Sequence, residues 1–274
     1  MKNDIEERKE VRKASERILA RVNILGVGVH AVNMQGAVEA IESCIADGKK
    51  GYVCVTGVHG IMEAQKDSAL SKIFEKAMLV TPDGMPTVWI GRLRGFARMR
   101  RVFGPDLMLE MCRASIEKGY THFLYGGNDG VAEELRARLE TLFPGIKIVG
   151  TYTPPFRALD SQERREIDGI FARLRPNITW VGLSTPKQER FMAEYLPELD
   201  TQVMIGVGAA FDLHTGRIKD SSSWVKEAGL QWLHRLLQDP KRLWRRYFFN
   251  NPRFVWKISL QLAGLRRYPL KSSS

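Results

Sequence analysis

Short apolar runs alternate with amphipathic stretches along most of this chain of 274 residues. The apolar runs, each bounded by glycine, proline or small polar residues, predict buried strands. The predicted strands are Val22–Val29, Tyr52–Thr56, Ala77–Val80, Thr121–Tyr125, Ile146–Gly150, Ile178–Leu183 and Gln202–Val207. Helical spacing of apolar residues predicts helices over Gly36–Ile45, Ile61–Ala77, Asp106–Glu117 and Asp160–Leu174, with others ending at Leu142 and starting at Lys187. This alternation favours a mostly parallel sheet with helices on both faces, a Rossmann-like α/β fold.

One predicted strand ends in a turn that contains a single carboxylate. The apolar run is followed by the sequence TPDGMP at residues 81–86, in which Pro82 and Gly84 mark a sharp turn and Pro86 suits the first turn of a helix. Ligands bind outside the carboxyl ends of strands in open α/β sheets, so Asp83 stands where a general base would lie. An aspartate that caps a helix or closes an Asx turn would explain the same pattern.

Two further predicted strand ends carry residues suited to ligand binding. The loop TGVHG, residues 56–60, offers the hydroxyl of Thr56 and the imidazole of His59, although a histidine at a helix start also commonly bonds the backbone. Gly126 and Gly127 follow the predicted strand Thr121–Tyr125 and precede a helix. Glycines before a helix N-terminus allow close approach of a phosphate or diphosphate.

The last two predicted strand ends are polar as well. Gln188 can donate and accept hydrogen bonds at once, as sugar hydroxyls require, and Lys187 could neutralise a phosphate or simply be solvated. The loop after the final strand places Gly206 and Gly208 beside the carboxylate of Asp212. Each loop alone is ordinary, but four of them at the same edge of a sheet favour a polar cleft.

Several common cofactor motifs are missing from the sequence. Gly26-Val27-Gly28 lacks the third glycine of the dinucleotide fingerprint, and no P-loop occurs. There is also no D-x-D pair and no H-E-x-x-H motif, so we expect neither a metal nor another cofactor. A departing diphosphate would then need arginines and backbone amides, and the candidates are Arg98, Arg100 and Arg101, just before the VFG stretch.

Composition limits the cellular context. With 44% hydrophobic and 27% charged residues, the chain suits one large domain, or one domain with an appendage. Cys44, Cys54 and Cys112 lack metal-ligand spacing and are expected to be buried thiols of a reduced cytosolic protein. The sequence has no apolar run long enough to span a membrane, and its charged N-terminus does not resemble a signal peptide.

The formal net charge of +11 is concentrated near the C-terminus. Residues 240–274 contain nine basic residues and no acidic one. On a helix, four of them fall within one arc of roughly 140°, opposite an apolar and aromatic face. This pattern favours an interfacial helix that binds anionic lipid, and a helix packed on the core with a solvated basic side is the alternative. The four are Lys241, Arg242, Arg245 and Arg246, and the opposite face carries Leu243, Trp244, Tyr247 and Phe248.

The ordered motifs of this chain resemble those of the WecG/TagA/CpsF glycosyltransferases, glycosyltransferase family 26. The resemblance covers about Asn23 to Phe254. It implies metal-independent, inverting transfer of a hexose or N-acetylhexosamine-type sugar from a UDP-sugar to a polyprenyl-diphosphate-linked saccharide, in cell-surface or exopolysaccharide biosynthesis. The matching stretches are TPDGMP-VW (81–89), RVFGPDL (101–107), LYGG (124–127), PPF (154–156), GLSTPKQE (182–189), GVGAAFDLHTG (206–216) and WLHRLLQDPKRLWRRY (232–247).

The resemblance also implies roles for individual residues. Asp83 matches the proposed catalytic base, Thr56 an active-site threonine and Gln188 an active-site glutamine, while Arg101 matches an arginine that holds the diphosphate. The C-terminal appendage is expected to close over the site at the membrane and to bring further arginines to the leaving diphosphate. The candidates for that contact are Arg242, Arg245 and Arg246.

The sequence departs from the family pattern at two places. The family's T-x-N loop reads Thr56-Gly57-Val58 here, with His59 next to it and no asparagine, and KDSSS (219–223) replaces the R-A-P motif before the appendage. The TGVHG variant is most similar to the exopolysaccharide branch that includes the xanthan glucosyltransferase. We therefore expect a charged N-terminal helix or tail (1–21), an α/β glycosyltransferase domain (22–220) and a membrane-contacting appendage (221–274) on the inner face of the cell membrane.

Two other classes of protein fit parts of the same pattern. Arginines and aromatics in a basic tail also describe a nucleic-acid-binding protein, although such a protein would not need the polar loops. A non-catalytic sugar-nucleotide-binding protein would use the same cleft. The expected partners are a UDP-sugar, the lipid-linked acceptor and an anionic membrane surface, with no nucleic acid, and homo-oligomer formation is left open.

Overall fold

The computed structural model describes residues 20–270, apart from the side chains of Ser223, Arg242 and Arg246. The expected N-terminal helix or tail therefore lies almost entirely outside the described residues. The core is a six-stranded sheet with strand order β4-β3-β8-β7-β5-β6, and every pairing in it is parallel. The strands are β3 (Gly51–Thr56), β4 (Leu79–Pro82), β5 (Thr121–Gly126), β6 (Lys147–Tyr152), β7 (Ile178–Gly182) and β8 (Val203–Gly206).

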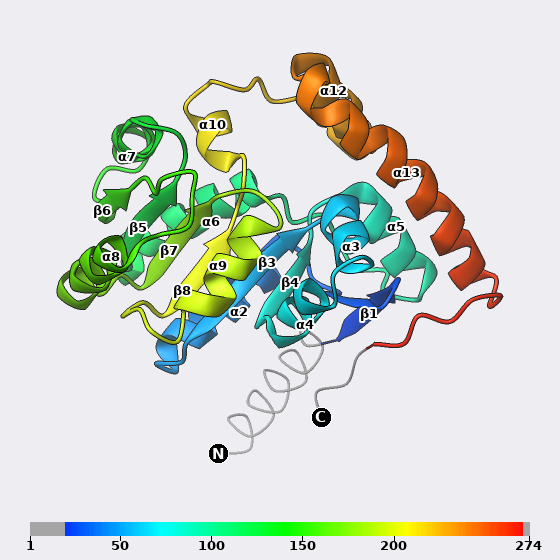
Figure 1. The fold of residues 1–274 in the computed structure, drawn as a ribbon, viewed down its shortest axis with the longest axis horizontal. Helices are drawn as coiled ribbons and strands as arrows, with labels where there is room; N and C mark the ends of the chain where they lie inside the picture. The colour runs from blue at the N-terminus through cyan, green and yellow to red at the C-terminus, as the bar shows by residue number, and fades with distance from the viewer. Residues whose placement is uncertain (1–19, 271–274) are drawn as a thin grey trace.

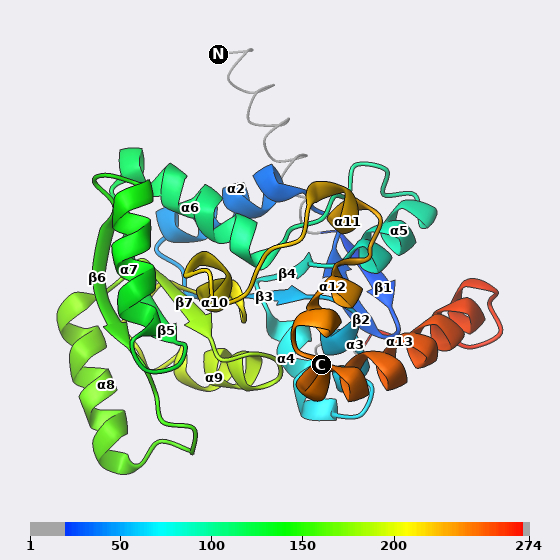
Figure 2. The ribbon, with the colours of Figure 1, turned by 90° about the horizontal axis from the view of Figure 1, so that it is seen from above.

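Helices cover both faces of this sheet, which confirms the predicted α/β class (Figures 1 and 2). One face carries α2 (Met34–Ala46), α6 (Gly104–Lys118) and α7 (Val131–Leu142), and the other carries α3 (Val58–Ala64), α4 (Ser68–Lys76), α8 (Ser161–Leu174) and α9 (Lys187–Tyr195). The buried side chains divide into two apolar clusters, one under each helical layer. Cys44, Cys54 and Cys112 lie in these clusters as free, buried thiols, as predicted.

The predicted strand Val22–Val29 is wrong, because the chain turns back in its middle. It forms a two-stranded antiparallel hairpin, β1 (Arg21–Ile24) and β2 (Val27–His30), beside the main sheet. The two turn residues, Leu25 and Gly26, have φ angles of 51° and 83°. Positive φ at both central residues gives the turn the twist that matches a tight hairpin. Of these two residues, only Gly26 is a turn signal in the sequence.

The predicted helix Ile61–Ala77 is divided into α3 and α4. Asp67 caps the second helix, since its carboxylate accepts hydrogen bonds from the backbone N–H groups of Ala69 and Leu70. An aspartate at this position satisfies N–H groups that have no partner within the helix. The periodic apolar pattern continues across the break because both helices pack on the same apolar cluster.

Four helices follow the last strand, and the last three of them fold back over the edge of the sheet. After the short α10 (Ala210–His214), the chain forms α11 (Ser223–Glu227), α12 (Gln231–Gln238) and α13 (Pro240–Leu262). They lie over α3 and α5 (Met85–Leu93), on the side away from α7 and α8 (Figure 1). Leu243, Phe254 and Ile258 are the buried apolar side chains of α13. Within residues 20–270, no helix has the length and hydropathy needed to cross a bilayer.

Candidate active site

Two adjoining cavities lie where the carboxyl ends of the strands meet the C-terminal helices. The larger, about 620 Å³, lies between α3, α5 and the helices α11–α13. The smaller, about 100 Å³, lies between the loop after β8, the start of α6 and the start of α9. The residues that line both cavities are Val55, Asp83, Phe103, Thr185 and Arg235.

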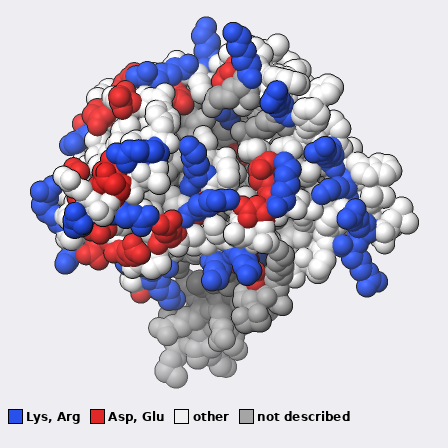
Figure 3. All heavy atoms as spheres, viewed as in Figure 1, with Lys and Arg blue, Asp and Glu red and all other residues white. Residues whose placement is uncertain are grey.

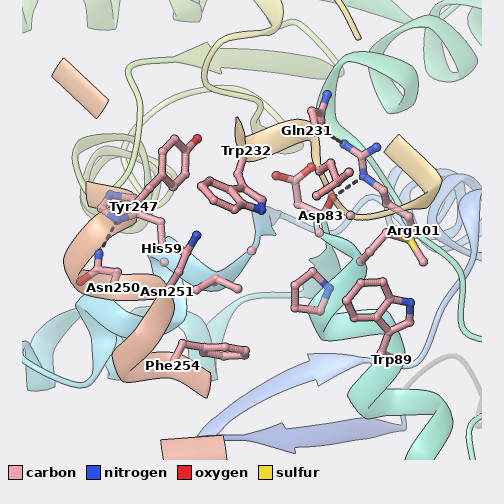
Figure 4. A pocket seen from close by; sticks show the side chains of 18 of the residues that line it. His59, Asp83, Trp89, Arg101, Gln231, Trp232, Tyr247, Asn250, Asn251 and Phe254 are labelled. Atoms are coloured by element: carbon pink, nitrogen blue, oxygen red, sulfur yellow. Dashed lines mark hydrogen bonds between the residues drawn. The ribbon is translucent and has the colours of Figure 1, made fainter. Parts of the chain in front are cut away.

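Asp83 lines both cavities and therefore lies at their junction. Figure 4 shows it in the wall of the larger one. Its backbone N–H donates to the carbonyl of Thr56 at 3.0 Å, which fixes the turn after β4 against the end of β3. The N-cap of the following helix is Gly84, and Pro86 lies in the first turn as predicted. The carboxylate of Asp83 is therefore not the cap of α5, which weakens the capping explanation of this residue.

Arg101 connects the Asp83 turn to the C-terminal helices. Its Nε donates to the backbone carbonyl of Asp83 at 2.6 Å, and its other end donates to the side chain of Gln231 on α12 (Figure 4). Its guanidinium group lies over the ring of Phe103 at 4.2 Å. Stacking on an aromatic ring leaves the edge of a guanidinium group available to donate hydrogen bonds, so Arg101 can serve the turn and a bound anion together.

The smaller cavity is built around Gln188, which is buried at the start of α9. Its Oε1 accepts from the N–H of Gly208 at 3.0 Å, and its Nε2 donates to Glu189 at 3.2 Å. The buried carboxylate of Glu189 also accepts from the hydroxyl of Thr185 at 2.8 Å. These bonds orient the Gln188 amide and hold the loop after β8 in place. Asp212, at the start of α10, lines the same cavity.

Desolvation shifts the pKa of two titratable groups that line neither cavity, Asp106 at the start of α6 and His214 at the end of α10. It raises the pKa of Asp106, although the cations Lys226 and Arg101 partly oppose that shift. Burial also lowers the pKa of His214, whose Nε2 lies 3.1 Å from the carbonyl of Pro105. Both shifts favour the neutral form, and the contact of His214 with Pro105 ties α10 to the start of α6.

The polar wall of the larger cavity comes from α3 and α13. The ring of His59 lies 3.3 Å from the amide of Asn250 and 3.9 Å from the carboxylate of Glu63 (Figure 4). Burial alone would raise the pKa of Glu63, but the hydrogen bond from Lys66 and the nearby His59 lower it. His59 thus links the strand-end loop to the C-terminal helices.

Three predicted glycines lie outside both cavities. A Cβ atom on Gly126 would lie 2.7 Å from the carbonyl oxygen of Gly182, and one on Gly206 would lie 2.9 Å from Met192. Gly127 donates its N–H to Gly182 at 3.2 Å and has φ of 81°. Close packing of backbone and side chains accounts for these glycines, and their contact with substrate stays a prediction.

Thr56 and Lys187 also line neither cavity. Thr56 is buried, and its hydroxyl faces Gly60, whose Cβ position would lie 2.1 Å away. That hydroxyl has no hydrogen-bond partner within the described part of the chain. Lys187 is exposed at the start of α9. A contact of either side chain with substrate therefore stays a prediction.

The C-terminal arginines divide between the cavity and the surface. Arg235 of α12 lines both cavities and is not among the predicted site residues; its only signal in the sequence is its place in the stretch WLHRLLQDPKRLWRRY. Arg245 is exposed, with its guanidinium carbon 5.5 Å from the centroid of the Trp244 ring. The side chains of Arg242 and Arg246 lie outside the described residues. In residues 20–270, no cluster of three or more His, Cys, Asp or Glu side chains could hold a metal ion.

Comparison with known proteins identifies relatives of this chain. The model of the glycosyl transferase WecG/TagA/CpsF family matches residues 22–268. A Bacillus spizizenii protein described as N-acetylglucosaminyldiphosphoundecaprenol N-acetyl-beta-D-mannosaminyltransferase is 30% identical over 222 residues, covering 81% of this chain and 84% of the relative. A Bacillus subtilis protein with the same description is 29% identical over 215 residues, covering 78% of this chain and 82% of that relative. The matched region of the family model includes the sheet, both cavities and the helices α11–α13.

Proposed function

This chain belongs to the WecG/TagA/CpsF family of glycosyltransferases, and from that premise we propose the reaction it performs. It transfers a hexose or N-acetylhexosamine-type sugar from a UDP-sugar to a polyprenyl-diphosphate-linked saccharide, with inversion and without a metal ion. The relatives are described as acting on an undecaprenol-diphosphate-linked sugar, which supports the lipid-linked acceptor. The product would serve cell-surface or exopolysaccharide biosynthesis.

The position of Asp83 at the junction of the two cavities carries this proposal. The smaller cavity, with Gln188 and Asp212, suits the hydroxyls of a donor sugar. The larger cavity has room for the acceptor. A carboxylate between them can take the proton from the acceptor hydroxyl as that oxygen attacks the anomeric carbon of the donor. A single displacement of this kind inverts the configuration at that carbon.

The leaving UDP needs positive charge where its diphosphate separates from the sugar. Arg235 lines both cavities, and Arg101 lines the larger one beside the Asp83 turn. Guanidinium groups donate several hydrogen bonds in a fixed geometry and match a diphosphate well. These two arginines can stabilise the charge that develops on the leaving group, so the reaction does not require a metal at that point.

The identity of the transferred sugar is left open between a hexose and an N-acetylhexosamine. The described relatives transfer N-acetylmannosamine, but they are only 29–30% identical to this chain. His59, bonded to Asn250, stands in the loop where the family pattern has an asparagine. A changed side chain in the wall of the acceptor cavity is consistent with a different saccharide.

The test is UDP release from a panel of UDP-sugars, with and without a polyprenyl-diphosphate mono- or disaccharide, in the presence of EDTA. We expect acceptor-dependent release from one donor, with the product bond in the inverted configuration. Release that required a divalent ion would contradict the metal-free reaction. Tight binding of a UDP-sugar without release in any mixture would instead favour a non-catalytic sugar-nucleotide-binding protein.

A further inference from the structure

The two ends of the larger cavity differ in chemistry. One end holds Asp83 and the arginines Arg101 and Arg235. The other end is lined by apolar side chains from two helices that are far apart in the sequence, and in Figure 4 Trp89 and Phe254 lie below the polar side chains. These apolar residues are Trp89, Ile90 and Leu93 of α5 and Phe254, Val255 and Ile258 of α13.

The apolar end opens to the outside between α5 and α13. Phe254 and Ile258 are 3% and 7% exposed, so they form the closed side of the cavity. Leu93 is 74% exposed and Val255 is 60% exposed, although both line the same cavity. On each helix the lining residues are spaced i, i+1 and i+4, which places them on one face. The cavity is therefore a groove that leads from charged residues, past buried apolar ones, to an apolar mouth.

We propose that this α5–α13 groove binds the first isoprene units of the acceptor lipid. The inference rests on the proposed function for the acceptor, in which a diphosphate joins the saccharide to the isoprenoid chain. The attacking saccharide has to reach Asp83, so the isoprenoid on the far side of its diphosphate leads away from the charged end of the cavity. The saccharide needs hydrogen-bonding partners, which the wall with His59 and Asn250 offers. The apolar groove is then the place for the isoprenoid chain.

If the isoprenoid leaves the groove at Leu93 and Val255, its length should affect which acceptor the enzyme selects. Burial of isoprenoid carbons in the groove adds affinity in proportion to the apolar area that is removed from water. The enzyme would then select its acceptor by the lipid as well as by the sugar, even when no membrane is present. Simple partitioning of the acceptor into a bilayer would give no such preference in solution.

The experiment is titration calorimetry of the full chain with dimethylallyl, geranyl and farnesyl diphosphate, in solution without vesicles. We expect the association constant to rise about tenfold for each added isoprene unit until the groove is filled. The double variant Leu93→Gln/Val255→Gln should lose most of this dependence on chain length. The matched control is Trp256→Gln/Leu142→Gln, which changes two exposed apolar residues that line neither cavity and should keep the wild-type dependence.

Both substituted pairs are on the surface, so the folded state should tolerate them, and thermal unfolding checks this directly. Equal affinity for the three diphosphates, or the same chain-length dependence in both double variants, would overturn the inference. Turnover is measured separately with saccharide-bearing acceptors of the same chain lengths. Binding that depends on isoprenoid length without any sugar transfer would support isoprenoid binding in the groove and contradict the proposed function. Sugar transfer without any dependence on isoprenoid length would support the proposed function and contradict isoprenoid binding in the groove.

Discussion

Hydrogen bonds of its own backbone fix the position of Asp83, and its carboxylate does not cap a helix. The N–H of this residue bonds Thr56, its carbonyl accepts from Arg101, and Gly84 takes the capping position of α5. The turn is therefore rigid while the side chain lies at the meeting point of two cavities. A fixed carboxylate between a donor and an acceptor is what a general base requires.

Asp83→Asn should fold normally and lose sugar transfer. Asparagine keeps the size of the side chain but cannot accept a proton, so kcat should fall by roughly 10²–10⁴-fold. Asp168→Asn, on the exposed surface of α8, is the matched control and should keep wild-type kcat. Acceptor-dependent UDP release measures both, and full activity of Asp83→Asn would remove this residue from the role of base.

Arg235→Gln should reduce transfer more than the change of any surface arginine on the same appendage. Arg235 lines both cavities, whereas Arg253 of α13 is exposed and lines neither. Loss of one preorganised donor to a developing charge typically lowers kcat by about 10²–10³-fold. Arg253→Gln is the control, assayed with a water-soluble acceptor so that membrane contact plays no part. Equal activity of the two variants would exclude Arg235 from diphosphate stabilisation.

At the scale of helices and strands, local sequence signals predicted most of the fold. The six strands of the sheet and the start of α5 follow from apolar runs and from the placement of Pro82, Gly84 and Pro86. The hairpin at residues 21–30 was missed because Leu25, with φ of 51°, gives no turn signal. Pairing between segments that are far apart in the chain is not encoded in local periodicity, so contacts such as His59 with Asn250 could not be foreseen.

The same limit applies to the site. Asp83, Gln188, Gly208 and Asp212 were predicted because each follows a strand, and the carboxyl ends of parallel strands share one edge. Arg235 and the polar residues of α12 and α13 reach that edge only because the C-terminal helices fold back over it. The burial of residues such as Leu243 and Phe254 holds these helices there. The sequence of the tail is equally compatible with a helix that faces a membrane, so it does not predict this burial.

The Gln261 side chain links the far end of α13 to the hairpin by hydrogen bonds. Gln261 accepts a hydrogen bond from the buried N–H of Leu25 at 2.8 Å and donates to the carbonyl of Asn23 at 3.1 Å. Gln261→Leu would leave the Leu25 N–H without a partner, which costs about 1–3 kcal/mol. We expect the free energy of unfolding to fall by that amount and amides near the end of α13 to exchange faster.

Denaturant unfolding and hydrogen exchange measure these two effects. Gln162→Leu, at an exposed position in the first turn of α8, is the control and should change neither. Unchanged exchange at α13 in Gln261→Leu would show that apolar packing alone holds this helix on the hairpin.

At the scale of the whole molecule, the side of α13 differs from the side of α7 and α8 in its charge and in its exposed apolar surface. The side that carries α7 and α8 mixes acidic and basic residues, whereas on the side of α13 the visible charges are mainly basic and separated by uncharged surface (Figure 3). Residues 240–274 have no acidic residue, and the exposed apolar side chains of α13 include Trp244, Phe248 and Phe249. Cations beside exposed aromatics suit an anionic membrane surface. We infer that the C-terminal helices dock on that surface and bring the mouth of the α5–α13 groove close to the lipid.

This docking predicts that Lys241→Gln/Arg245→Gln weakens binding to anionic vesicles. Both residues are exposed at the start of α13, and each basic residue near an anionic surface contributes about 1 kcal/mol. Removal of two charges should therefore lower the partition coefficient roughly thirtyfold at physiological salt, with little change for neutral vesicles. Flotation with vesicles of each composition measures the effect.

The control Arg165→Gln/Arg173→Gln removes the same charge from the exposed surface of α8, on the other side of the molecule, and should bind as the wild type does. Equal losses in the two double variants would mean that net charge, rather than the surface of α13, governs attraction to the membrane.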